Sequence, residues 1–340
     1  MPIISPINRM ISKAVQPIEE EAFTWMRTVL SSVSGVSSFL GSNLANFLKS
    51  RFKVIGTYLK NPVEIPGVFT FPTDIFNRDE CQLVYHSFRP DYTIFCVGVT
   101  PLHEGAREKE KAELLNTNGL IYVTEFCHRY KSRIIYLSTS DVFSGLKDVY
   151  REIDISDSHT ILGKTKSAGE FYLEKNSLDY LIFRCCQLYG RSLLTWRPNF
   201  FEYVQQNFIK GNEINCDNLL SYGHLDVNYL GMIIELAINK NLRNLLLQVC
   251  SKDISTFYKF AESYCKTFGE NPNLLKKGRW DFPTFSETEK LKDRERSFKM
   301  VVENLENYLN ISVPTIEESL RYTFERFVGQ DRDNSKELNL

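Results

Sequence analysis

The sequence predicts an α/β protein with a doubly wound parallel sheet and a smaller C-terminal lobe. Residues 28–60 hold a β-rich run, a glycine-containing turn, a helix with one apolar face and a second β-rich run. Further β-rich runs follow at 93–97, 133–137, 180–184 and 245–250, and helix-forming stretches lie between several of them. This alternation is typical of a parallel sheet covered by helices on both faces.

Length and composition are those of a soluble globular protein. The 340 residues are enough for about two domains or lobes, and 43% of them are hydrophobic. The net charge of -1 gives no electrostatic reason to expect a nucleic acid or an anionic membrane as partner. No apolar run approaches the ~18 residues of a membrane-spanning helix, and no secretory signal pattern is visible. We therefore expect neither nucleic acid nor membrane as a partner.

The cysteine pattern indicates a reducing compartment. None of the eight cysteines forms a C-x-x-C pair, and the five histidines form no H-E-x-x-H motif. Several cysteines, for example Cys96 and Cys185, lie inside apolar β-rich runs. Buried free thiols explain this pattern better than disulfides or a metal site do. We expect a cytoplasmic protein without a bound metal.

The turn after the first β-rich run has the spacing Gly35-x-x-Ser38-x-x-Gly41. Backbone N–H groups at a helix N-terminus bind pyrophosphate, and glycine is needed where a Cβ would block the phosphate or the tight turn. Taken alone, the stretch also fits an ordinary strand–turn–helix. We expect a dinucleotide to be bordered by Gly35, Ser38, Phe39, Leu40 and Gly41.

Two later motifs strengthen this interpretation. Residues 138–145 are STSDVFSG, and residues 161–170 are ILGKTKSAGE. Together with the glycine turn, they resemble the extended short-chain dehydrogenase/reductase superfamily, and within it the dTDP-4-dehydrorhamnose reductases. The regulatory β subunit of methionine adenosyltransferase is a relative of those enzymes. The resemblance covers about 27–327 and implies a Rossmann-type doubly wound sheet, with a C-terminal substrate lobe that closes over a nucleotide sugar.

The resemblance also implies domain boundaries. We expect an N-terminal extension at 1–25, an NAD(P)-binding Rossmann domain at 26–190, a region that is mainly substrate lobe at 191–328, and a flexible tail at 329–340. Segments near 225–250 should return from the lobe to the Rossmann domain. The extension is either a real appendage or the result of an upstream start codon.

Further cofactor contacts follow from the resemblance. An acid after the second strand would bind the ribose 2′-hydroxyl of NAD, but none is present. Lys60, with Arg51 as a second candidate, could meet a 2′-phosphate instead, which favours NADP(H) over NAD(H). Asp74 and Ile75 match a pair that contacts adenine, although Asp74 could also cap the next helix. Gly98 keeps the small residue that lets the backbone approach the cofactor, whereas the family's neighbouring asparagine is absent.

The catalytic pattern is incomplete. Thr139 takes the position of a catalytic hydroxyl that donates to a carbonyl oxygen during hydride addition. Lys166 matches the lysine of a Tyr-x-x-x-Lys pair and would hold the nicotinamide ribose, but Leu162 takes the place of the tyrosine. Loss of a general acid typically costs roughly 100- to 10,000-fold in rate. A bound water could supply the proton instead. The upstream loop also offers three side chains as proton donors, none of them favoured: Tyr150, His159 and Thr160.

Substrate contacts are implied for the C-terminal part. Asn199 matches the start of the helix that lines the substrate pocket. Arg279 and Trp280 could bind a nucleotide diphosphate and its base by charge and stacking. A solvated charge run explains residues 276–283 equally well.

Two functions remain open. The first is an NADP(H)-dependent reductase of a dTDP-4-keto-6-deoxyhexose or related nucleotide sugar, with hydride transfer impaired by the missing tyrosine. The second is a non-catalytic NAD(P)-binding subunit, a pseudoenzyme that regulates or scaffolds a partner enzyme. Three departures from the resembled family weigh against efficient catalysis: Ser38 in place of the middle glycine of the turn, the absent asparagine near 96–98, and Leu162 in place of the tyrosine. A third function, that of an epimerase or dehydratase, also needs the tyrosine, so Leu162 counts against it equally. A homodimer is compatible with each function.

Overall fold

The computed structural model describes residues 30–99, 109–177, 179–193, 198–278 and 294–337. Its centre is a seven-stranded sheet in the order β11-β6-β5-β4-β1-β2-β3, and all of its strand pairs are parallel. The strands are β1 (Leu30–Ser34), β2 (Lys53–Tyr58), β3 (Phe69–Pro72), β4 (Tyr92–Phe95), β5 (Arg133–Thr139), β6 (Tyr180–Cys185) and β11 (Leu245–Val249). This confirms the predicted fold class.

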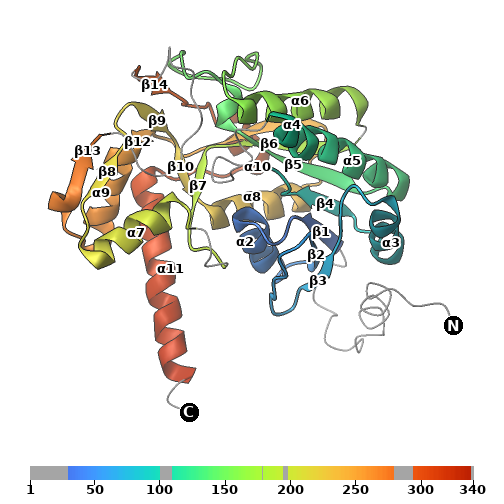
Figure 1. The fold of residues 1–340 in the computed structure, drawn as a ribbon, viewed down its shortest axis with the longest axis horizontal. Helices are drawn as coiled ribbons and strands as arrows, with labels where there is room; N and C mark the ends of the chain where they lie inside the picture. Colours follow the sequence, from blue (N-terminus) through green and yellow to red (C-terminus); the bar gives the residue numbers. More distant parts are fainter. Residues whose placement is uncertain (1–29, 100–108, 178, 194–197, 279–293, 338–340) are drawn as a thin grey trace.

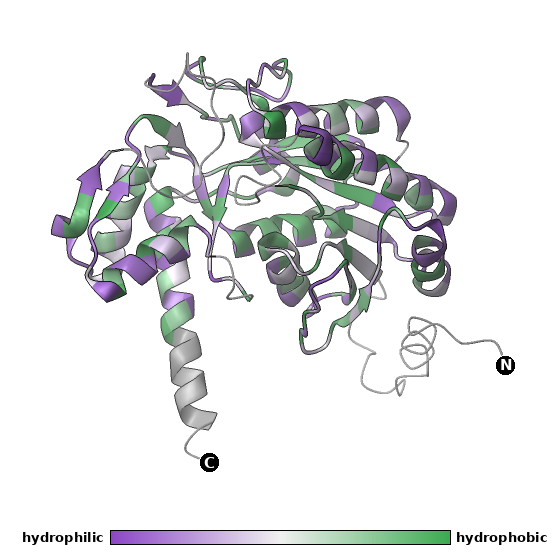
Figure 2. Ribbon diagram, in the orientation of Figure 1, coloured by the Kyte–Doolittle hydropathy of each residue, from purple (hydrophilic) through white to green (hydrophobic). Residues whose placement is uncertain are grey.

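Helices cover both faces of the sheet (Figure 1). One group packs together as α2, α8 and α10, and a second group packs as α3, α4, α5 and α6. Their bounds are α2 (Phe39–Leu48), α3 (Arg78–Phe88), α4 (Lys109–Glu113), α5 (Gly119–Tyr130), α6 (Ile161–Asn176), α8 (Val227–Asn239) and α10 (Glu303–Leu309). The central strands are largely hydrophobic (Figure 2), as expected for strands that are buried on both faces.

The C-terminal lobe combines short strands with three helices. Its helices are α7 (Phe200–Lys210), α9 (Phe257–Phe268) and α11 (Ile316–Glu337). Its strand pairs are β7 (Gln187–Tyr189) with β10 (His224–Asp226), and β8 (Ile214–Cys216) with β13 (Leu275–Lys277). A third small sheet contains β9 (Leu220–Tyr222), β12 (Ser255–Thr256) and β14 (Arg296–Ser297). An aromatic cluster that includes Tyr189, Phe201 and Phe260 forms the core of the lobe.

Two segments of the C-terminal part lead back to the sheet. Helix α8 packs against α2, and β11 pairs with β6 at the sheet edge. The last helix, α11, continues to Glu337 and so extends into the segment 329–340 that we predicted to be a flexible tail. Residues 1–25 lie outside the described part of the chain.

All eight cysteines are free, and seven of them are buried. None of the helices in the described segments is long and apolar enough to cross a membrane. Within the same segments, we find no group of three His, Cys, Asp or Glu side chains that could hold a metal ion.

Candidate functional site

The turn between β1 and α2 has a shape that only glycine permits at two positions. Gly35 has a φ of 78°, and a Cβ there would lie 3.0 Å from the backbone of Cys96. A Cβ on Gly41 would lie 2.3 Å from the carbonyl oxygen of Gly35. The start of α2 therefore sits directly on the turn at the carboxyl ends of β1 and β4. A phosphate group bound by α2 would occupy this place.

Ser38 has a definite role in this turn. It is the N-cap of α2, and its Oγ accepts a hydrogen bond of 2.9 Å from the Gly41 backbone N–H. The serine that replaces the family's middle glycine thus satisfies one of the N–H groups left unpaired at a helix start. Phe39 and Leu40 form the first residues of the helix beside it, and both are half-buried.

The residues expected around the adenosine half of a cofactor lie after β2 and β3. Lys60 is exposed, two residues past the end of β2. Arg51 is engaged elsewhere, because its Nε forms an ion pair of 3.2 Å with Glu235 on α8. The suggested role of Arg51 at a 2′-phosphate therefore receives no support from this geometry.

Asp74 and Ile75 follow β3 directly. The Asp74 carboxylate accepts a hydrogen bond of 2.9 Å from the Phe76 N–H, and Ile75 is buried. The alternative that Asp74 caps the next helix is wrong. Asn77 caps α3 instead, with its Oδ1 accepting from the Asp79 and Glu80 N–H groups at 3.1 and 3.3 Å.

Gly98 lies where the loop after β4 meets α6. A Cβ on Gly98 would be 2.6 Å from Asn116 Oδ1 and 3.7 Å from Lys166 Nζ. Asn116 is fully buried in the π-helical turn Leu114–Asn118. Its Oδ1 accepts from the Val99 N–H at 2.8 Å, and its Nδ2 donates to Thr165 Oγ1 at 2.9 Å. Asn116 therefore fixes the loop after β4 against α6, and π-helical turns are frequent at functional sites.

Lys166 extends from α6 toward the end of β5. Its Nζ donates a hydrogen bond of 2.8 Å to the Leu137 carbonyl oxygen and lies 4.8 Å from the centroid of the Tyr136 ring. Burial lowers the pKa of Lys166 to about 8. The ammonium group is thus held beside Gly98, and at neutral pH it is mainly charged. Leu162, one turn earlier on α6, is half-buried and has no polar group.

Thr139, at the end of β5, belongs to a hydrogen-bond chain that we did not predict. Its Oγ1 donates to Asp141 Oδ2 at 2.9 Å, and the Tyr222 hydroxyl donates to Asp141 Oδ1 at 3.1 Å. Asp141 is 3% exposed, and burial raises its pKa to about 6. The signal for Asp141 was in the sequence, because this acid lies two residues after Thr139 inside the STSDVFSG motif.

The start of α6 packs against the same segment. Thr160 caps this helix by accepting from the Gly163 N–H at 3.0 Å. A Cβ on Gly163 would lie 1.9 Å from the Asp141 carbonyl oxygen, so the backbone of α6 contacts Asp141 directly. The structure therefore brings the glycine turn, Gly98, Lys166 and Thr139 to one edge of the sheet.

Comparison with known proteins decides the family. The sequence matches a family model described as the RmlD substrate binding domain over residues 30–327. The chain belongs to this family. The dTDP-4-dehydrorhamnose reductase of Aggregatibacter actinomycetemcomitans is 30% identical over 159 residues, which are 46% of this chain and 51% of that protein. The methionine adenosyltransferase 2 subunit beta of Rattus norvegicus is 24% identical over 177 residues, 52% of this chain and 51% of that protein.

The chain spans about half the length of these curated relatives. Solved structures extend the likeness to nearly the whole fold. A dTDP-4-dehydrorhamnose reductase from Bacillus anthracis in complex with NADP has a TM-score of 0.71 at 21% identity, and the match covers 88% of this chain and 100% of that one. A UDP-glucose 4-epimerase from Thermotoga maritima with UDP-glucose has a TM-score of 0.73 at 17% identity, covering 89% and 99%. The resemblance drawn from the motifs is thereby confirmed.

The upstream loop of this family member supplies no obvious replacement for the missing tyrosine. The Tyr150 ring is buried and stacked on Phe143 at 4.1 Å, and its hydroxyl lies 3.3 Å from Ser144 Oγ. The Thr160 hydroxyl is engaged in capping α6, and His159 is an exposed loop residue. The contacts of Tyr150 and Thr160 are therefore those of structural residues.

Predicted substrate contacts are only partly placed. Asn199 is 6% exposed and caps α7, accepting from the Glu202 N–H at 3.2 Å and donating to the Gly190 carbonyl at 2.8 Å. These bonds position the start of α7, and a contact between Asn199 and substrate stays a prediction. Arg279 and Trp280 lie outside the described residues.

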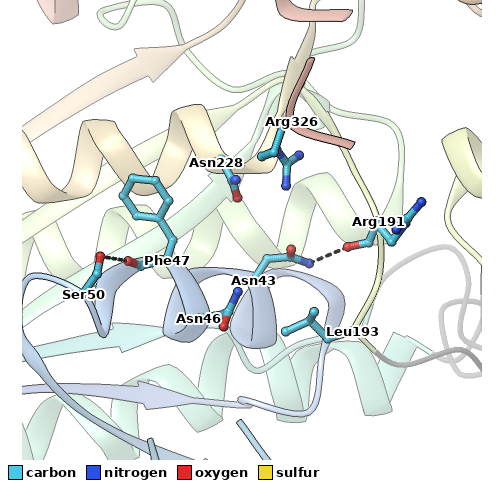
Figure 3. Close-up of a pocket in the computed structure, with 8 residues that line it drawn as sticks. All are labelled: Asn43, Asn46, Phe47, Ser50, Arg191, Leu193, Asn228 and Arg326. Carbon is cyan, nitrogen blue, oxygen red and sulfur yellow. Dashed lines mark hydrogen bonds between the residues drawn. The ribbon is translucent and has the colours of Figure 1, made fainter. Parts of the chain in front are cut away.

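A polar pocket of about 260 Å³ lies away from these residues, between α2, α8, α11 and the loop after β7 (Figure 3). Its lining includes Asn43, Arg191, Asn228 and Arg326, and it contains none of the predicted site residues. Arg326 is already paired with the buried Asp226 at 2.6 Å. The pocket is therefore distinct from the edge of the sheet that carries Thr139 and Lys166.

Proposed function

We propose that this protein binds NADP(H) at the turn 35–41 and Lys166 and slowly reduces the carbonyl of a nucleotide-linked 4-keto-6-deoxyhexose of the dTDP type. The observation that carries the proposal is the grouping of Gly98, Lys166 and Thr139 around the end of β5. A side chain at Gly35 or Gly41 would clash with backbone, and one at Gly98 with Asn116, so glycine is what allows the tight turn and the close packing of the loop beside it.

The residues present fit such a cofactor, which supplies a hydride when bound in its reduced form. Ser38 and Gly41 hold the start of α2 in place for the pyrophosphate. Lys166 would bind the nicotinamide ribose, and Asp74 and Ile75 would meet the adenine. Lys60 would face the 2′-phosphate, which favours NADP(H) over NAD(H). The related Bacillus anthracis reductase is described as a complex with NADP, which supports this choice.

The substrate class is inferred from the relatives. Several of them are described as dTDP-4-dehydrorhamnose reductase or dTDP-4-keto-6-deoxy-D-glucose reductase. In our proposal Thr139 would donate to the substrate carbonyl oxygen as negative charge develops on it. Asn199 and, outside the described residues, Arg279 and Trp280 would meet the nucleotide part.

Leu162 favours a second candidate function. A protein that has lost the general acid could keep its cofactor and act as a regulatory or scaffold subunit. The similarity to the methionine adenosyltransferase 2 subunit beta, whose name describes a subunit, supports this alternative. We propose a cytoplasmic location in either case. The two candidates share cofactor binding and differ in turnover.

One experiment separates the two candidates. Purified protein is titrated with NADPH and NADH by fluorescence, and a dTDP-4-keto-6-deoxyhexose is then added. We expect NADPH to bind more tightly than NADH and to be oxidised slowly once the sugar is present. The Lys166→Met variant should bind NADPH at least tenfold more weakly, because the ribose contact is lost. Failure of both cofactors to bind would refute the proposed function.

Restoring the tyrosine tests the cause of slow turnover. Leu162→Tyr should raise the rate of NADPH oxidation by roughly 100-fold or more, since a positioned general acid contributes about that much. Phe171→Tyr is the matched control, because it adds a phenol to the exposed face of the same helix. Binding of NADPH without oxidation, even in Leu162→Tyr, would favour the non-catalytic subunit instead.

A further inference from the structure

The Thr139 hydroxyl has a buried acid as its partner. Thr139 Oγ1 donates to Asp141 Oδ2 at 2.9 Å and also accepts from the Asp141 N–H at 3.2 Å. An ionised carboxylate can only accept hydrogen bonds. While Asp141 is ionised, the single hydroxyl hydrogen of Thr139 is therefore directed at Asp141 and cannot point at a substrate carbonyl.

Protonation of Asp141 reverses this arrangement. A protonated carboxyl can donate its own hydrogen to Thr139 Oγ1, which frees the Thr139 hydrogen to point at another acceptor. The second carboxyl oxygen stays bonded to the Tyr222 hydroxyl at 3.1 Å. The 2.9 Å distance between Thr139 Oγ1 and Asp141 Oδ2 suits a hydrogen bond in either direction.

We propose that Asp141 is the proton reservoir that substitutes for the missing tyrosine, and that it acts through the Thr139 hydroxyl. This inference rests on the proposed carbonyl reduction. Leu162 removes the usual donor, and Gly163, the next residue, brings α6 against the Asp141 backbone. The Asp141 backbone thus lies against the first turn of α6, one residue after the position of the missing tyrosine.

The proton transfers balance with the hydride that the carbonyl carbon receives from the reduced dinucleotide. The electron pair of the C=O π bond moves to the carbonyl oxygen, which takes the hydrogen of Thr139. The Thr139 oxygen takes the hydrogen of Asp141, and Asp141 is left as a carboxylate that accepts from Tyr222. A proton from solvent then restores Asp141. The product is an alcohol, and Thr139 ends unchanged.

The surroundings of Asp141 are suited to a carboxyl that changes its protonation state. Burial is the largest effect and raises the pKa of Asp141 to about 6, against the hydrogen bonds from Thr139 and Tyr222 and the positive charge of Arg296. Tyr222 comes from β9 and Arg296 from β14, and they are the charged or titratable groups that act on Asp141 in the described part of the chain. Helix α6 contacts the main-chain carbonyl of Asp141 with Gly163, which cannot titrate.

The protonation state can be measured without any turnover. Infrared spectra of the full-length protein are recorded between pH 4.5 and 8, without cofactor or sugar. We expect a protonated-carboxyl C=O band that disappears with a midpoint near pH 6 and is absent from Asp141→Asn. Asp154→Asn, which changes an acid in the nearby loop, should keep the band. A carboxyl that is fully ionised at pH 5 would overturn the proposal.

The role in turnover has its own readout. Wild-type kcat should rise as the pH falls through about 6, because Asp141 must be protonated. In Asp141→Asn, kcat at pH 5.5 should fall at least tenfold and lose this pH dependence, whereas the KM and the NADPH dissociation constant should change less than threefold. Asp141→Glu should recover part of kcat. A purely structural role would instead lower the melting temperature and NADPH affinity together.

A double mutant completes the test. In the Leu162→Tyr background, Asp141→Asn should reduce kcat less than threefold, because the new tyrosine supplies the proton and the two changes are then not additive. An equal loss in both backgrounds, or a wild-type pH profile in Asp141→Asn, would overturn the relay. A titrating Asp141 in a protein that never oxidises NADPH would overturn the proposed reduction itself, so the two failures are distinguishable.

Discussion

At the scale of single residues, Asp141 couples the site to stability. Its pKa is raised from 3.8 to about 6 by burial. The folded state therefore binds more protons than the unfolded state between about pH 4 and 6. The wild-type protein should lose stability as the pH rises through this window, because ionisation places a charge in a site from which water is excluded.

Asp141→Asn removes this cost, since an amide cannot ionise. Relative to wild type, the variant should gain up to about 3 kcal/mol of unfolding free energy between pH 4 and pH 7, at 1.36 kcal/mol per pKa unit. Urea unfolding at pH 4, 5.5 and 7 measures the difference. Asp154→Asn is a control of opposite sign, because hydrogen bonds from the Arg151 N–H and Lys147 lower the pKa of Asp154. If the difference in unfolding free energy between Asp141→Asn and wild type does not change with pH, the raised pKa of Asp141 is contradicted.

At the scale of elements, α6 carries the site and is fixed to the sheet by a buried ion pair. Arg184 on β6 donates to Glu170 from Nε at 3.0 Å and from Nη2 at 2.8 Å, and the two side chains are 6% and 3% exposed. Asn116 adds a second attachment through Thr165. Lys166 lies between these two anchors, so its position depends on both.

Glu170→Ala should destabilise the protein by about 3–5 kcal/mol, because it leaves the Arg184 guanidinium buried and unpaired. The double variant Glu170→Leu/Arg184→Met, which replaces the ion pair by two apolar side chains, should recover most of the lost unfolding free energy. Chemical denaturation gives both values. Glu174→Ala, at an exposed position one turn further along α6, should change the unfolding free energy by less than about 0.5 kcal/mol. A loss of similar size in Glu174→Ala would argue against the ion pair as the anchor.

The elements themselves were largely predictable, because each β-rich run is apolar enough to be a buried strand. The start of α10 at Glu303 was not predictable in this way, since it is set by the preceding backbone, which pairs with Tyr150. Asp74 and Asn77 both precede α3, and sequence alone could not decide which one caps it. The contact between Asp141 and Tyr222 joins residues 81 positions apart, so it depends on how the lobe folds back onto the sheet.

At the scale of the whole molecule, α11 joins the C-terminal lobe to β10, which leads into α8 and back to the seven-stranded sheet. Asp226, at the end of β10, is fully buried and accepts from Thr323 Oγ1 at 2.7 Å and Arg326 Nη2 at 2.6 Å. Ser319 accepts from the Tyr189 hydroxyl at 2.7 Å. Because Asp226 is also the N-cap of α8, which packs on α2, these bonds connect α11 with the helix that follows the glycine turn.

Two arginines of α11 offer a matched comparison. Arg326→Ala should lower the unfolding free energy by about 2–3 kcal/mol, because it leaves the buried Asp226 carboxylate without its cation. Arg321→Ala should change it by less than about 0.5 kcal/mol, since Arg321 is 62% exposed and pairs with Glu317 across one turn. Urea unfolding followed by near-ultraviolet circular dichroism of the tyrosines and by far-ultraviolet circular dichroism measures both changes. If the lobe and the sheet unfold as one unit, the two signals should coincide in wild type and in Arg326→Ala alike. Equal losses in the two variants would contradict a special contribution of the Arg326–Asp226 pair.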